Sequence, residues 1–100
     1  MNRNMMRQAQ KMQAQLLKVQ EELENLTVEG SAGGGVVKVI MTGKQTVESV
    51  TIEPEAAEDV DLLQDLVAAA VNDAFGKTQE LAAQKMSTVT GGMNIPGLGF

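Results

Sequence analysis

A heptad pattern of apolar residues runs without interruption along the first quarter of the chain. Its members are separated by alternating steps of four and three residues, which places them on one face of a helix over roughly residues 4–26. They are Met5, Ala9, Met12, Leu16, Val19, Leu23 and Leu26. Because this strict seam suits a helical partner or a second chain better than a small sheet, we predict a homodimer seam at the first six of these positions.

The same helix carries four cations on nearly the opposite face: Arg3, Arg7, Lys11 and Lys18. They lie within about 80° of one another and span about 22 Å along the helix axis, a length that matches several phosphates. No acidic residue precedes Glu21. A solvated outer face is the alternative interpretation of such a stripe. We predict that these four residues bind DNA.

The net charge of −5 is unevenly distributed along the chain. Residues 53–75 contain seven acidic side chains and no cation, whereas the four cations of the first helix start unneutralised. A polyanion should therefore approach one end of the molecule and be repelled from another.

After residue 26 the apolar period changes from helical to alternating, which predicts three strands and then a second helix. The strands are expected near residues 26–30, 36–42 and 47–53, with a bulge or a late start at Val47, which is out of phase with Val50 and Ile52. The second helix is expected from Asp59 or Asp61 to Ser87, with a capping box formed by Asp61 and Gln64 and a close contact or bend at Gly76.

These elements predict an α+β fold in which a helix, a three-stranded antiparallel sheet and a helix form one domain over residues 1–90. Residues 91–100 (GGMNIPGLGF) are predicted to be a flexible tail. A chain of 100 residues buries a limited core, which favours assembly into a homodimer.

The composition argues against an enzyme. The chain has no histidine and no cysteine, which removes the usual acid–base, nucleophilic and zinc-binding groups. The carboxylates of residues 53–61 lack calcium-loop spacing, so no metal is expected there. No cofactor and no small-molecule substrate are expected either. With two phenylalanines and no tyrosine or tryptophan, stacking on single-stranded bases is not expected either. No membrane span or signal peptide is visible, which predicts a cytoplasmic protein.

Short segments in order along almost the whole chain resemble the YbaB/EbfC family of bacterial nucleoid-associated proteins. They are residues 6–13 (MRQAQKMQ), Val37-Lys38-Val39 followed by Gly43, Ile52-Glu53-Pro54, residues 65–70 (DLVAAA), Asn72-Asp73-Ala74, Lys85-Met86 and residues 90–93 (TGGM). The resemblance implies an intertwined or tweezer-like homodimer with protruding first helices. It also implies DNA binding with little sequence preference, in the nucleoid or cytoplasm.

Two functions therefore stand as hypotheses. The first is a non-enzymatic homodimer that binds duplex DNA through its basic first helices. The second is a protein-interaction or scaffold module that uses the helical seam and the C-terminal tail, with weak or no DNA binding.

Overall fold

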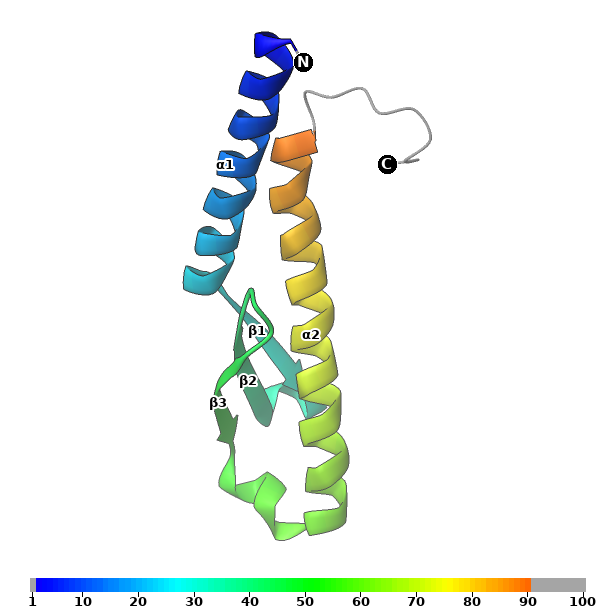
Figure 1. The fold of residues 1–100 in the computed structure, drawn as a ribbon. Helices are drawn as coiled ribbons and strands as arrows, with labels where there is room; N and C mark the ends of the chain where they lie inside the picture. The colour runs from blue at the N-terminus through cyan, green and yellow to red at the C-terminus, as the bar shows by residue number, and fades with distance from the viewer. Residues whose placement is uncertain (1, 91–100) are drawn as a thin grey trace.

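The computed structural model describes residues 2–90 and confirms the predicted α+β fold. Along the chain, one helix precedes a three-stranded sheet and a second helix follows it, with a short 3₁₀ turn before β2 and another before α2. In space, α2 runs along the sheet and continues beside α1 (Figure 1). The elements are α1 (Arg3–Asn25), β1 (Thr27–Ala32), η1 (Gly33–Gly35), β2 (Val37–Thr42), β3 (Val47–Ile52), η2 (Pro54–Glu58) and α2 (Val60–Thr90). The tail predicted at residues 91–100 lies outside the described residues.

The sheet is an antiparallel meander in the order β1-β2-β3. Its register pairs Val39 with Gly30 on one side and with Val50 on the other. The pairing of β2 with β3 shifts between Ile40 and Met41, which face Ser49 and Val47, so Glu48 is the extra residue of a bulge. The irregularity predicted at Val47 is thereby confirmed.

The N-terminal half of α2 covers β1 and β2 and closes the main core. Val37, Val39 and Met41 of β2 are buried against Ala70 and Ala74 of α2. The helix comes this close because β1 carries Gly30 at the crossing. A Cβ atom there would overlap the carbonyl oxygen of Ala70 and lie 2.5 Å from the backbone nitrogen of Ala74.

Of the close contact or bend predicted at Gly76, the close contact is wrong, because a Cβ atom at that position would meet nothing within 4 Å, and the bend stays a prediction. The glycine that permits close approach belongs to the strand, and the helix contributes alanines to the same contact. The close contact between helix and sheet therefore depends on Gly30 of β1 and not on Gly76 of α2.

The start of α2 also differs from the predicted capping box. The Oδ1 atom of Asp59 accepts a hydrogen bond from the backbone N–H of Leu62 at 3.1 Å, and the helix begins at Val60. Asp59 is therefore the N-cap, and Asp61 lies inside the first turn. The helix continues to Thr90, three residues beyond the predicted end at Ser87.

A second, smaller core joins the two helices where α1 lies along the C-terminal half of α2 (Figure 1). Val19 and Leu23 of α1 and Val89 of α2 are buried, and Met12, Leu16, Leu81 and Ala82 surround them. We call the sheet with residues 60–78 the body, and α1 with residues 79–90 the arm. Gly43 connects the two, because a Cβ atom there would lie 2.5 Å from the carbonyl oxygen of Leu23. Neither described helix combines the length and apolar character that crossing a membrane requires.

Candidate nucleic-acid interface

The four cations predicted to bind DNA all lie on α1, and all are exposed to solvent. Within residues 2–90, none of Arg3, Arg7, Lys11 and Lys18 forms an ion pair. Three lysines elsewhere do: the Nζ atoms of Lys38, Lys77 and Lys85 lie 3.9, 3.3 and 3.3 Å from carboxylate oxygens of Glu29, Asp73 and Glu22. Lys44, in the turn between β2 and β3, is the remaining described cation outside an ion pair.

Like charges along α1 and one contact with α2 both reduce the pairing of these cations. Arg3, Arg7 and Lys11 follow one another at intervals of four residues, so each has a like charge one turn away. Lys18 has Glu21 and Glu22 three and four residues ahead; the carboxylate of Glu22 is bound by Lys85 of α2, and Glu21 forms no ion pair within residues 2–90. Like charges at this spacing cost an isolated helix about 0.2–0.5 kcal/mol per pair, a cost that a bound polyanion would remove.

The position of α1 points most of this stripe away from the protein, while Lys11 also lines a groove between α1 and the end of α2. Val19 and Leu23, which lie on the seam side of the helix, are buried against α2, so the opposite side faces solvent. The acidic segment around η2 lies at the far end of the molecule from the N-terminus of α1 (Figure 1). The charge separation expected from the sequence is therefore a separation in space.

The structure divides the predicted dimer seam into two parts. Val19 and Leu23 are buried within the chain, with Met12 and Leu16 partly buried beside them, so this part contacts the protein's own α2. Met5 and Ala9 are exposed. A contact of this second part with another chain stays a prediction, whereas Val19 and Leu23 offer no free surface for one.

An uncovered apolar surface that the sequence pattern did not reveal lies along β3. Val47, Val50 and Ile52 are 42, 43 and 37% exposed. The register places Val50 and Ile52 beside Val39 and Val37, on the side of the sheet that α2 covers. The helix leans over β1 instead, where Asp73 accepts from the backbone N–H of Ser31 at 3.0 Å and Lys77 donates to the carbonyl oxygen of Glu29 at 2.7 Å.

Phe75 of α2 extends this surface. Helical geometry places it about 160–200° around the helix from Asp73 and Lys77, hence on the side of β3, and it is 41% exposed. We call Val47, Val50, Ile52 and Phe75 the β3 flank. The widths of the elements could have revealed it, because one helix about 10 Å wide does not cover three strands spaced about 4.8 Å apart.

Asp73 has a structural role, because it joins α2 to β1. The backbone N–H of Ser31 and the ammonium group of Lys77 hold the pKa of its carboxyl below the ordinary value of 3.8. Because the folded state favours the charged form, the resulting stability is present above that pH and is lost as pH falls through the lowered pKa. Across the described part of the chain, no three histidine, cysteine, aspartate or glutamate side chains come together as a metal site.

The class of fold is shared with a crystal structure of an uncharacterized protein from Helicobacter pylori. The two structures superpose with a TM-score of 0.76 over 88% of this chain and 96% of that one, at 19% sequence identity. A sequence model of the YbaB/EbfC DNA-binding family matches residues 1–93. The chain belongs to the YbaB/EbfC DNA-binding family.

Two relatives show how similar the sequences in this family are. A protein from Desulforamulus reducens is 58% identical over 94% of this chain and 91% of its own length. One from Pelotomaculum thermopropionicum is 52% identical over the same shares of the two chains. Both carry the name nucleoid-associated protein, which confirms the resemblance noted in the sequence.

Proposed function

We propose that this protein is a non-enzymatic homodimer that binds duplex DNA in the bacterial cytoplasm, as part of the nucleoid, with little sequence preference. The observation that carries this proposal is the row of four exposed α1 cations without ion pairs, on a protein whose net charge is −5. DNA phosphates supply the negative charges that these four side chains lack within the protein.

Weak sequence preference follows from the type of contact. Lysine and arginine bound to phosphates position a duplex without reading its bases. Of the two phenylalanines in the chain, Phe75 lies on the β3 flank and not on the cationic face of α1. Unrelated duplexes should therefore bind within a few-fold of one another.

A second copy of the chain against the β3 flank is the form of dimer that the exposed surfaces favour. It would remove four large apolar side chains from water, and β3 is an edge strand whose outer side is unpaired within the described residues. This arrangement leaves both α1 helices free, so a dimer would offer up to eight stripe cations. The dimer surface proposed here thus differs from the helical seam predicted from the sequence.

Charge reversal on α1 tests the DNA-binding role. Arg7→Glu with Lys11→Glu should abolish binding to a generic duplex in a gel-shift assay, because it replaces two phosphate-binding cations with anions and leaves both helical contacts of Val19 and Leu23 intact. Circular dichroism and light scattering should show unchanged helicity and mass.

A matched pair of single variants controls for net charge. Lys11→Glu and Lys44→Glu change the charge equally and both affect an unpaired, exposed lysine, but only Lys11 belongs to the stripe. Lys11→Glu should weaken binding far more than Lys44→Glu. Equal losses of affinity would show that only the overall charge of the protein matters and that the stripe has no special role. If the wild type does not bind DNA even at low salt, the protein-interaction hypothesis is favoured.

A further inference from the structure

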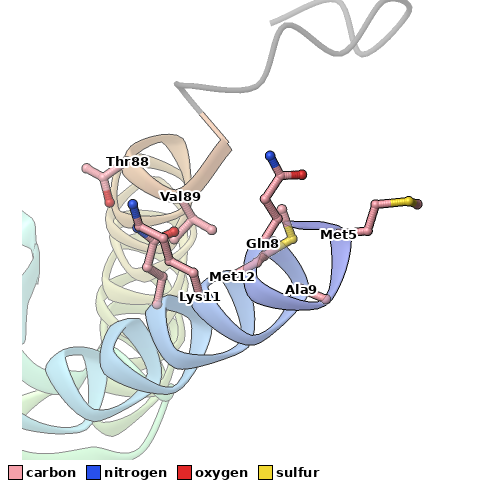
Figure 2. Close-up of a pocket in the computed structure, with 8 residues that line it drawn as sticks. Met5, Gln8, Ala9, Lys11, Met12, Thr88 and Val89 are labelled. Atoms are coloured by element: carbon pink, nitrogen blue, oxygen red, sulfur yellow. The ribbon is translucent and has the colours of Figure 1, made fainter. Parts of the chain in front are cut away.

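An amphipathic groove lies in the arm, where α1 and the end of α2 separate. It has a volume of about 490 Å³, and Figure 2 shows the side chains that line it. The lining residues come from α1 and from the last turns of α2: Met5, Gln8, Ala9, Lys11, Met12, Gln15, Thr88 and Val89. The groove belongs mainly to α1, whose Met5 is 61% exposed.

The lining residues of α1 form two rows that run side by side along the helix. Three apolar residues lie within about 60° of one another around the helix axis: Met5, Ala9 and Met12. Three polar residues occupy the neighbouring 60° or so: Gln8, Lys11 and Gln15. The groove therefore offers an apolar row and, next to it, a row of hydrogen-bond donors that contains one cation.

The charge of the groove is positive. Lys11 is exposed and forms no ion pair within residues 2–90, and none of the lining residues is acidic. Arg7 lies one turn away from Lys11 on the same helix, and the first acidic residue of α1 is Glu21. An occupant that brings a carboxylate to Lys11 would supply the missing opposite charge.

A DNA duplex would use only part of this groove. Its phosphates can pair with Lys11, but they offer no apolar surface to Met5, Met12 and Val89 of the lining. The α1 helix of a second copy is also unsuited, because it would bring four more cations and no acidic residue before Glu21. The lining instead matches an occupant that has both apolar and acidic side chains.

The dimensions of the groove suit one face of a helix. Met5 to Gln15 span about 15 Å along α1, which is the length of about ten residues of a partner helix. The volume suits the few large side chains that such a helix inserts, at positions i, i+4 and i+7. Methionine side chains adapt to the side chains that meet them, so Met5 and Met12 suit this role.

We propose that this groove binds an acidic amphipathic helix of a partner protein. Apolar side chains of that helix pack against Met5, Met12 and Val89, and one of its carboxylates pairs with Lys11. The inference goes beyond DNA binding and does not depend on it. Lys11 belongs to both surfaces, so a bound helix removes one cation from the stripe.

A synthetic peptide tests the proposal on the full chain. The probe is a fluorescently labelled, alanine-based helix of about 18 residues, with leucine at i, i+4 and i+7 and glutamate beside each leucine. Its counterpart carries lysine in place of each glutamate. Fluorescence anisotropy should show at least tenfold tighter binding of the glutamate peptide. The net charge of −5 favours the opposite order, so this preference requires a local positive surface.

A matched pair of variants locates the site. Lys11→Glu should remove the preference for the glutamate peptide, because it places a carboxylate in the groove. Lys44→Glu changes the net charge equally outside the groove and should keep the preference. In methyl NMR, the glutamate peptide should shift the resonances of Met5 and Met12 and leave that of Met41, buried in the body, unchanged.

Four results would overturn the proposal. Equal affinities of the wild type for the two peptides, or equal effects of Lys11→Glu and Lys44→Glu, would show that Lys11 does not select an acidic helix. Unmoved Met5 and Met12 resonances at saturating peptide would place the peptide elsewhere. Resonances of these two residues that shift with protein concentration before peptide is added would assign the groove to a second copy. These measurements contain no DNA, so their failure leaves the DNA-binding proposal unaffected.

Discussion

The body and the arm of this protein differ in how deeply their apolar side chains are buried. In the body, Val37, Val39, Ala70 and Ala74 are completely buried, and Gly30 leaves no room for a methyl group. Among the described side chains of the arm, three are buried, and most of α1 faces solvent. The body therefore supplies the stability of the fold, while the arm presents charge. Changes in the body should alter folding, and changes in the arm should alter binding.

The largest effect on folding is expected at Gly30. Gly30→Ala places a methyl group against the backbone of Ala70 and Ala74 and should lower the free energy of unfolding by about 3 kcal/mol. Gly76→Ala is the matched control, because its methyl group meets nothing within 4 Å and improves helix propensity by about 1 kcal/mol. Urea unfolding at one fixed protein concentration should show opposite shifts, and shifts of the same sign would refute the contact.

The next effect concerns assembly through the β3 flank. Val50→Asp places a charge among apolar side chains that the proposed dimer buries, so the dimer dissociation constant should rise at least 100-fold, or about 2.7 kcal/mol. Val60→Asp makes the same substitution at an exposed valine in the first turn of α2, outside the flank, and should leave the dimer intact. Sedimentation equilibrium measures both, and equal dissociation constants would place the interface elsewhere.

The smallest effect separates the two aspartates at the start of α2. Asp59→Ala removes the side-chain acceptor for the N–H of Leu62 and should lower the free energy of unfolding by about 1 kcal/mol. Asp61→Ala removes a carboxylate from the first turn without removing a cap, so its effect should be a few tenths of a kcal/mol. Thermal melting of the two variants shows which aspartate caps the helix. A larger loss of stability for Asp61→Ala would support the capping box predicted from the sequence.

The parts of the fold that depend on local sequence could be predicted. Heptad spacing identified α1, alternation identified the strands, and the phase of Val47 revealed the bulge. Asp59 and Asp61 both precede the same apolar run, so the sequence could not show which of them caps α2. The 3₁₀ turn of η2, which ends at Glu58, fixes the start of the helix.

The parts that depend on where elements cross could not be predicted. Periodicity shows that one side of α1 is apolar, but it does not show that Val19 and Leu23 contact the protein's own α2. Likewise, alternation assigns Val50 and Ile52 to the core side of the sheet, whereas their exposure depends on α2 leaning toward Gly30. The cationic stripe was found from sequence because helix geometry alone places its four members together. That Glu22 is bound by Lys85 and not by Lys18 could not be predicted, because it depends on where α2 lies.

The salt dependence of duplex binding tests the central claim, that unpaired cations of α1 bind DNA phosphates. With about four to six contacts for a dimer, the logarithm of the binding constant should fall against the logarithm of salt concentration with a slope near −4 to −5. Arg7→Gln with Lys11→Gln halves the stripe without adding anions and should reduce the slope to about −2 to −3. A slope that stays at the wild-type value in this variant would show that the phosphates are bound by other residues.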